Sequence, residues 1–311
     1  YGNAVGVPTV GGELELDDTY SGNPLVNVMC LGILRREDLV LGTSGPPGTV
    51  AVLLGNATGR DGIGGASVLA SAGFDDASGT KRPAVQVGDP FEEKKLIEAC
   101  LELYSRKLVV GVQDLGAAGL SCATSEPAAR AGTGMTVDLD AVHVREPGMT
   151  AAELLMSESQ ERMLAFVEPA RVDDVLEVAR RWEIDASVIG EVTADPSLRV
   201  RHGGELVADI PAASLTDGAP RYHVVRPGVA DVLLRLLDDP SVASTAWVSE
   251  QYDSMLFLNT VVGPGHDAAL LRLEDTGKGL AVSVDGNGRL CYLDPRRGAA
   301  RIVYEAALNV A

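Results

Sequence analysis

The residues Leu108-Val-Val-Gly-Val112 and the following Gln-Asp-Leu-Gly-Ala-Ala-Gly-Leu-Ser-Cys122 set a single carboxylate, that of Asp114, between an apolar run and a glycine-rich turn. The apolar run predicts a short buried strand, and the small residues after it leave little side-chain bulk beyond its carboxyl end. Ligands often bind there in α/β folds, because backbone N–H groups and a helix N-terminus can approach an anion closely. Two interpretations fit: Asp114 binds a ligand, or it only caps the next helix.

The composition is that of an acidic globular protein. The 311 residues are 46% hydrophobic, which is enough for about two domains with a full core. A net charge of −18 without a Lys/Arg cluster argues against nucleic acid or an anionic membrane as a partner. No apolar run approaches the roughly 20 residues that span a bilayer. Because the start, Tyr1-Gly-Asn3, resembles neither a signal peptide nor a natural initiation, we expect a piece of a longer protein.

The four cysteines are widely spaced and form no CxxC pair. They are Cys30, Cys100, Cys122 and Cys291. Their apolar or small-residue surroundings predict buried free thiols, as in a cytoplasmic protein.

A glycine-rich loop, residues 55–66, follows an apolar run at residues 49–54 that predicts a buried strand. Five glycines in twelve residues permit positive φ angles or a close approach of the backbone to an anion. The phosphate-loop candidates are Arg60, Gly62, Gly64 and Gly65. The loop lacks the Gly-Lys-Ser/Thr of a P-loop and strict GxGxxG spacing, so a purely structural loop is the alternative.

Polar side chains next to predicted elements are candidates for ligand binding. They are Gln86, Glu158, Ser159 and Gln160. The glutamine precedes a helix start with Asp89 as N-cap and Pro90 at the first helical position. The trio separates an apolar helix from an apolar strand, where such groups suit a sugar or amide ligand. A surface glutamine and a solvated connection are the alternatives.

Hydrophobic periodicity predicts a mixed α/β arrangement along the chain. Strands are expected at residues 13–16, 25–34, 135–140, 163–167, 187–192 and 279–284, with a hairpin over 198–210 that turns at Gly203-Gly204. Helices are expected at residues 90–108, 125–131, 151–156, 169–182, 229–237 and 301–311, the third with a capping box of Thr150 and Glu153.

Two further acidic residues, Asp267 and Asp285, lie on glycine turns after a loop-rich linker at residues 211–227. Carboxylates on such turns suit hard cations and bridged phosphates. Each turn alone is weak evidence.

Together, these motifs resemble those of one family, the synthetase subunits of phosphoribosylformylglycinamidine synthase. The motifs that carry the resemblance are Tyr1-Gly-Asn3, Gly6-Val-Pro-Thr-Val-Gly-Gly-Glu13, Thr58-Gly-Arg-Asp-Gly-Ile-Gly-Gly-Ala66, Gln86-Val-Gly-Asp-Pro-Phe91, Val112-Gln-Asp-Leu-Gly-Ala-Ala-Gly-Leu120, Ser157-Glu-Ser-Gln-Glu-Arg-Met163, Asn259-Thr-Val-Val-Gly-Pro-Gly265 and Asp285-Gly-Asn-Gly-Arg289. Several long motifs in the same order are far more specific than any one glycine turn.

The resemblance implies an α/β (α+β) fold of tandem aminoimidazole-ribonucleotide-synthetase-like (PurM-like) units, each with a ferredoxin-like half and a larger α/β half. Residues 1–45 would end the first N-terminal half. Residues 46–227 would form its substrate-binding companion, and residues 228–311 would begin the second N-terminal half.

The resemblance also implies a ligase of de novo purine biosynthesis, a carbon–nitrogen ligase with glutamine as amido donor. Such enzymes convert formylglycinamide ribonucleotide to the amidine with ATP, Mg²⁺ and ammonia from a glutaminase partner, and a small accessory subunit joins the complex. Gln86, Glu158, Ser159 and Gln160 match substrate-binding positions, and Asp114 matches a Mg²⁺ ligand. Asp267 and Asp285 resemble acidic positions around a second nucleotide site.

The family's histidine-containing segment, its Ser-His-Asn-His-Pro motif and a later ATP-binding stretch are not in the sequence. We therefore expect this chain alone to lack synthetase activity. The alternatives are another Mg-ATP enzyme of the superfamily, such as aminoimidazole ribonucleotide synthetase, selenophosphate synthetase or thiamine-monophosphate kinase, or a scaffold that binds a nucleotide or a partner without catalysis.

Overall fold

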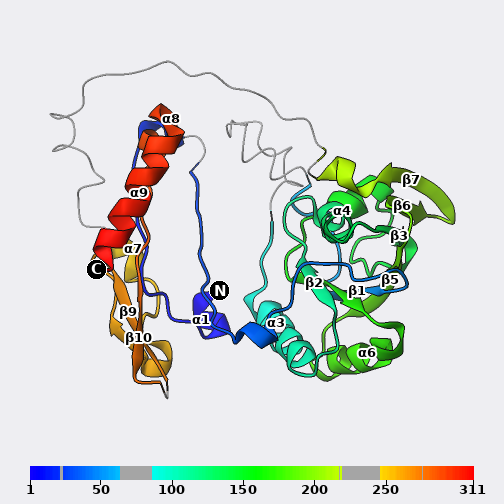
Figure 1. Cartoon of the computed structure of the whole chain (residues 1–311), viewed down its shortest axis with the longest axis horizontal. Helices are drawn as coiled ribbons and strands as arrows, with labels where there is room; N and C mark the ends of the chain where they lie inside the picture. Colours follow the sequence, from blue (N-terminus) through cyan, green and yellow to red (C-terminus); the bar gives the residue numbers. More distant parts are fainter. Residues whose placement is uncertain (22–23, 64–85, 217, 219–245, 275) are drawn as a thin grey trace. The chain divides into compact units, whose positions relative to one another are not determined.

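The computed structural model describes residues 1–21, 24–63, 86–216, 218, 246–274 and 276–311 (Figure 1). The chain divides into two compact units. The larger unit is Gly22–Arg221, and the smaller one combines Tyr1–Ser21 with Tyr222–Ala311. Across the described ranges, none of the helices has the length and apolar character needed to span a lipid bilayer.

A seven-stranded sheet forms the larger unit, in the order β2-β4-β1-β5-β3-β6-β7. The strands are β1 (Val50–Gly55), β2 (Gly111–Asp114), β3 (Gly134–Asp138), β4 (Arg162–Val167), β5 (Ala186–Thr193), β6 (Ser197–His202) and β7 (Glu205–Pro211). Neighbouring strands are antiparallel except β3 and β6, which are parallel. The predicted hairpin is confirmed, because β6 and β7 pair across Gly203 and Gly204, which both have positive φ.

Helices cover both faces of this sheet. They are α3 (Pro90–Ser105), α4 (Gly119–Ala131), α5 (Ala151–Met156) and α6 (Val172–Arg181). Figure 1 shows α3 and α6 on one side and α4 on the other. Successive residues of β1 alternate between the two cores: Val52 packs with residues of α3 and α6, whereas Leu53 packs with residues of α4 and α5. A strand buried on both faces must be apolar throughout, which explains why residues 50–54 are all apolar.

The predicted helix starts are confirmed at two positions. Asp89 caps α3 by accepting hydrogen bonds from the N–H groups of Phe91 and Glu92. Thr150 and Glu153 form the capping box of α5. These caps satisfy N–H groups that have no partner inside the helix.

The pairing of β1, β4 and β2 places three polar segments at one edge of the sheet. Gly55, the last residue of β1, lies opposite Arg162, the first residue of β4. Asp114, the last residue of β2, lies opposite Met163. Because β4 is antiparallel to both neighbours, the loop after β1, the turn after β2 and the segment before β4 meet at this edge.

The smaller unit contains a three-stranded sheet in the order β10-β9-β8. Its elements are α1 (Gly2–Val5), α7 (Ala246–Ser249), β8 (Thr260–Val262), β9 (Ala269–Leu273), β10 (Lys278–Val282), α8 (Gly288–Leu293) and α9 (Pro295–Asn309). The two sequence segments of this unit contact each other: the N–H of Thr9 donates to the carbonyl of Asp253 at 3.0 Å, and Arg289 pairs with Asp17.

Several predicted elements were wrong or displaced. Residues 13–16 and 25–34 form no strand, and apolar side chains in the second segment are exposed, Val26 by 87%. A strand needs a neighbour to satisfy its backbone groups, and none of the described strands pairs with these segments. The strand expected at residues 108–112 is displaced to Gly111–Asp114, because the Leu108 N–H continues the turn after α3 by donating to the Leu103 carbonyl.

Other boundaries and burial predictions also changed. Helix α4 begins six residues before the predicted start and contains Pro127, and α9 begins at Pro295 instead of Arg301. All four cysteines are free, but only Cys100 is buried and Cys30 is exposed. The helix expected at residues 229–237 lies outside the described residues.

Candidate functional site

The Glu158 side chain is the centre of the polar edge. It is only 2% exposed. Its Oε2 accepts a hydrogen bond from Gln86 Nε2 at 2.7 Å, and its Oε1 accepts one from the Ala118 backbone N–H at 3.1 Å. Two residues that the sequence selected separately, 72 positions apart, are therefore in direct contact. We call Gln86, Asp114, Ala118 and Glu158–Gln160 the Glu158 site.

Two glycines allow the backbone to come close to this site. A Cβ on Gly62, at φ +61°, would lie 2.6 Å from Glu158 Cβ, and one on Gly119, at φ +49°, would lie 1.9 Å from the Ser157 carbonyl oxygen. Real Cβ atoms essentially never approach other heavy atoms so closely. The glycine-rich loop predicts a close approach of the backbone at Gly62, and in this structure the group approached is the Glu158 side chain. Gly64 and Gly65 lie outside the described residues.

Ser159 and Gln160 have roles different from that of Glu158. Ser159 is 1% exposed, and its hydroxyl accepts from the Gly59 N–H at 3.0 Å and donates to the Asp61 carboxylate. Gln160 is partly buried, and its Nε2 donates to the Glu158 carbonyl at 2.7 Å. Ser159 thus joins the loop after β1 to the segment before β4, while the Glu158 carboxylate faces Gln86.

Asp114 is exposed at the end of β2, and its Oδ1 accepts from Gln113 Nε2 at 2.8 Å. The capping alternative is wrong, because the N-cap of α4 is Ala118 and its start has no side-chain cap in the described structure. Within the described ranges no group of three or more His, Cys, Asp or Glu side chains is placed to hold a metal ion. A single exposed carboxylate such as that of Asp114 still suits Mg²⁺, because this ion commonly takes one or two carboxylates and completes its shell with water and substrate phosphate.

Arg60 is engaged by the protein itself. Its Nε pairs with Glu153 at 2.8 Å and its Nη1 with Glu146 at 3.1 Å. The hydrogen bond from Arg60 lowers the pKa of the Glu153 carboxyl to about 2. The phosphate contact proposed for Arg60 stays a prediction, and a phosphate there would compete with two carboxylates.

Arg162 and Glu161 follow the Glu158 site along the chain and were not among the residues predicted from the sequence. Arg162 is 3% exposed, and its guanidinium donates to Thr58 and to the carbonyls of Ser157 and Ser159. Glu161 has φ +58°, and its carboxylate accepts from Asn56 Nδ2 and from the Asp89 N–H, both at 3.1 Å. The signal in the sequence was a pair of charged residues directly before an apolar strand, where burial of the strand end also buries the charges.

Asp267 and Asp285 lie at the same end of the smaller sheet. Ala269 of β9 pairs with Val282 of β10, Asp267 comes shortly before Ala269, and Asp285 comes shortly after Val282. Asp267 is exposed. Asp285 Oδ1 accepts from Asn309 Nδ2 at 2.8 Å, and its buried Oδ2 has no hydrogen-bond partner among the described residues. Nearby, burial raises the pKa of the Glu13 carboxyl, and the negative charges of Asp285, Glu15 and Glu305 raise it further.

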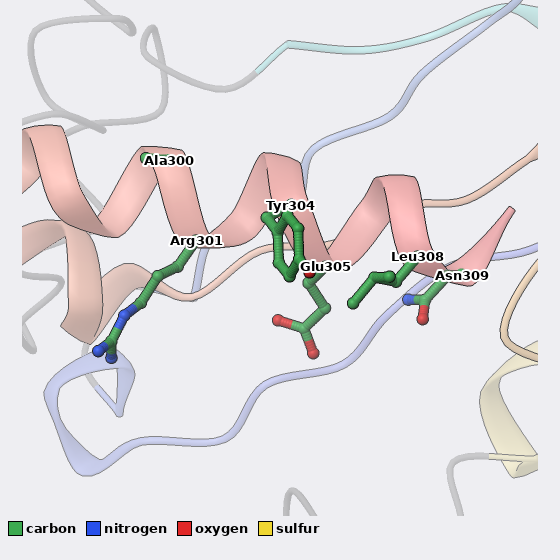
Figure 2. Close-up of a pocket in the computed structure, with 6 residues that line it drawn as sticks. All are labelled: Ala300, Arg301, Tyr304, Glu305, Leu308 and Asn309. Carbon is green, nitrogen blue, oxygen red and sulfur yellow. The ribbon is translucent and has the colours of Figure 1, made fainter. Parts of the chain in front are cut away.

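A shallow hollow of about 760 Å³ lies along α9 and includes Asn309, the partner of Asp285 (Figure 2). Its lining is Ala300, Arg301, Tyr304, Glu305, Leu308 and Asn309. Figure 2 shows that all of these side chains come from this one helix, so the hollow is an open surface and not an enclosed site.

Comparison with known proteins relates both units to one family. Residues 46–203 match the model of the C-terminal domain of AIR synthase related proteins, and residues 1–34 with 265–311 match the model of the N-terminal domain. The phosphoribosylformylglycinamidine synthase subunit PurL of Thermobifida fusca is 48% identical over 100% of this chain. This chain spans 45% of the length of that relative.

Two solved structures have the same fold. "T. maritima PurL complexed with FGAR" matches with a TM-score of 0.83 and 40% identity, covering 99% of this chain and 51% of that one. "T. maritima PurL complexed with ATP" matches with a TM-score of 0.76 and 38% identity, covering 97% of this chain and 48% of that one. With a family model that matches half of its length, and with this fold, the chain belongs to the AIR synthase related family.

Proposed function

We propose that the chain supplies the ribonucleotide-binding part of a phosphoribosylformylglycinamidine synthase, a ligase of purine biosynthesis. The observation that carries the proposal is the 2.7 Å contact between Gln86 and the buried Glu158 at the shared strand ends. It is supported by the 40% identity to a PurL protein whose solved complex contains FGAR, formylglycinamide ribonucleotide. In this proposal residues 46–227 form the binding domain, and residues 1–45 and 228–311 belong to two N-terminal halves.

The residues of the Glu158 site suit a ligand rich in hydroxyl and amide groups. The Glu158 carboxylate has lone pairs left to accept hydrogen bonds from ligand hydroxyls, and the Gln86 amide can both donate and accept. The N-terminus of α4 adds positive potential next to the carboxylate through the Ala118 N–H. We expect Ser159 to act by holding the loop after β1, because its hydroxyl is already bonded to Gly59 and Asp61.

Asp114 would be one protein ligand for Mg²⁺. The ion, when bound, would neutralise negative charge on phosphate oxygens. In the proposed reaction of the whole enzyme, the γ-phosphoryl group of ATP passes to the amide oxygen of the ribonucleotide, ammonia then attacks the amide carbon, and inorganic phosphate leaves. The solved ATP complex of a related protein supports ATP as the co-substrate. A glutaminase subunit, a small accessory subunit and a cytoplasmic location are further parts of this proposal.

The test is calorimetric titration of the 311-residue chain with formylglycinamide ribonucleotide. We expect one binding site on the wild-type chain, and about tenfold weaker binding by Glu158→Gln, because a charge-assisted hydrogen bond is lost. Glu177→Gln, an exposed change on α6, is the control and should bind like the wild type.

Absence of binding by a folded wild-type chain would contradict the proposal and favour the scaffold alternative. Titration of Asp114→Asn with and without Mg²⁺ adds a test of the metal assignment. The wild type should gain affinity from Mg²⁺ in the presence of ATP, and the variant should gain less.

A further inference from the structure

The Arg162 guanidinium is buried at the first residue of β4 and bonds only to uncharged groups among the described residues. Its Nε donates to the Ser159 carbonyl at 2.8 Å, its Nη2 to the Ser157 carbonyl at 2.6 Å, and its Nη1 to Thr58 Oγ1 at 3.0 Å. Burial lowers its pKa to about 10. A buried charge without a direct ionic partner is costly, and a salt bridge or an apolar residue would be the ordinary choice there.

The two carbonyls bonded by Arg162 belong to the residues immediately before and after Glu158. The Ser157 carbonyl belongs to the peptide plane that joins Ser157 to Glu158, and the Ser159 carbonyl belongs to the plane that follows Ser159. Holding both carbonyls restrains the backbone before and after Glu158 and so the direction of its side chain. The third bond ties the same guanidinium to the loop after β1. The same loop also bonds to Glu158 directly, because the Glu158 N–H donates a hydrogen bond to the Asp61 carbonyl at 2.8 Å. The planar guanidinium of Arg162 therefore joins the segment before β4 to the loop after β1, and the two bonded residues, Arg162 and Thr58, are 104 positions apart in the sequence.

This segment needs such support. Glu161 has φ +58°, a conformation that non-glycine residues seldom adopt. The Glu158 carboxylate also has little freedom, because a rotated side chain would leave the Ala118 N–H and Gln86 without their acceptor. Residues that hold a binding group in place from behind commonly set its affinity for a ligand.

We propose that Arg162 is a positioning residue, which fixes the Glu158 carboxylate in the orientation that binds a ligand with hydroxyl donors. For the identity of that ligand, the inference rests on the proposed function. Its structural part, that Arg162 fixes the orientation of Glu158, does not depend on the ligand.

The test uses the 311-residue chain with Arg162→Ala and Arg162→Lys, and it has two readouts. The first is the affinity for formylglycinamide ribonucleotide, which should fall about tenfold or more in Arg162→Ala because hydrogen bonds from a charged donor are lost. Millimolar guanidinium ion should restore part of that loss by filling the vacated space. The affinity of Arg162→Lys should exceed that of Arg162→Ala by less than added guanidinium ion restores, since an ammonium cannot reproduce the planar fork of donors.

The second readout, amide hydrogen exchange without ligand, does not depend on the proposed function. Exchange of the Ala118 and Glu158 N–H groups should accelerate in Arg162→Ala, while exchange of Leu53 and Leu164 in the sheet stays unchanged. The matched control is Val178→Ala, which creates a cavity in the core beneath α6. It lowers overall stability but should leave both the affinity and the Ala118 exchange at wild-type values.

The outcomes separate the two proposals. If the wild type binds and Arg162→Ala binds equally well with unchanged Ala118 exchange, the positioning role is wrong. If the wild type does not bind, the proposed function fails, and the exchange data still decide the role of Arg162. If Arg162→Ala does not fold, the same comparison is made with Arg162→Lys, for which wild-type affinity and exchange would overturn the inference.

Discussion

In the larger unit the buried Glu158 carboxylate accepts hydrogen bonds from Gln86 and the Ala118 N–H. In the smaller unit one buried oxygen of Asp285 has no hydrogen-bond partner among the residues described. In the sequence, Glu158 precedes the strand β4 in a polar cluster, and Asp285 follows β10 at a glycine turn. The difference shows that a carboxylate forms a candidate binding site when strand pairing places hydrogen-bond donors from other segments next to it.

The largest expected effect comes from blocking the close backbone approach beside the Glu158 site. Gly119→Ala should lower the free energy of unfolding by about 3 kcal/mol, because its Cβ would lie 1.9 Å from the Ser157 oxygen. Gly203→Ala is the matched control, since Gly203 also has positive φ but has no atom within 4 Å of its would-be Cβ. It should cost only about 1 kcal/mol. Urea unfolding of both variants measures this, and equal losses would contradict the close approach.

The second prediction compares the two carboxylates directly. Glu158→Ala should weaken binding of formylglycinamide ribonucleotide by about tenfold or more, because it leaves the Gln86 amide and the Ala118 N–H without their acceptor. Asp285→Ala should leave the affinity unchanged, because Asp285 belongs to the other unit. Calorimetric titration of both variants checks this. A larger loss in Asp285→Ala than in Glu158→Ala would reverse the ranking of the two regions.

The strands β1 and β4 could be predicted because both are buried on both faces of the sheet, and such strands are apolar runs. Residues 50–54 and 163–167 are apolar throughout, and both are covered on two faces. Gln86, Asp114 and Glu158 were predicted from residue type, from their positions next to predicted helices or strands and from the family resemblance. The direct contact of Gln86 with Glu158 could not be predicted, because it depends on the antiparallel pairing of β4 with β1 and β2.

Other features were beyond sequence reasoning for physical reasons. The apolar residues 25–34 look like a strand, but strand formation requires a neighbour, and the local pattern does not contain that information. Arg162 was overlooked because an arginine is usually exposed. Only the structure places its guanidinium between two carbonyls and a threonine hydroxyl.

A smaller effect should appear at His143, next to the end of β1. His143 Nε2 bonds to the Gly55 carbonyl and Nδ1 to Ser187 Oγ, and burial lowers its pKa below the ordinary 6.5. Below pH 6.5 the unfolded chain takes up the proton more readily, so stability should fall as pH decreases toward 5. Thermal unfolding of wild type and His143→Gln between pH 7 and pH 5 checks this. A wild-type curve no steeper than that of the variant would contradict it.

The smallest effect concerns the smaller unit. The pKa of Glu13 is raised chiefly by burial, and the charge of Asp285 adds to it. Asp285→Asn should therefore lower the Glu13 pKa toward 4.5 without removing the whole shift. Since a raised acid pKa means stability lost as pH rises through it, the variant should also lose less stability over that range. NMR titration of the Glu13 carboxyl measures the shift, and an unchanged pKa would show that the two carboxylates do not interact.

The most direct test of the central claim is amide hydrogen exchange of the 311-residue chain with and without formylglycinamide ribonucleotide. The Glu158 site predicts slower exchange in the ligand-bound chain at residues 55–63, 86–90, 114–119 and 157–162, with no change at residues 285–309. Protection confined to residues 285–309, or none at the shared strand ends of β1, β2 and β4 under saturating ligand, would contradict it.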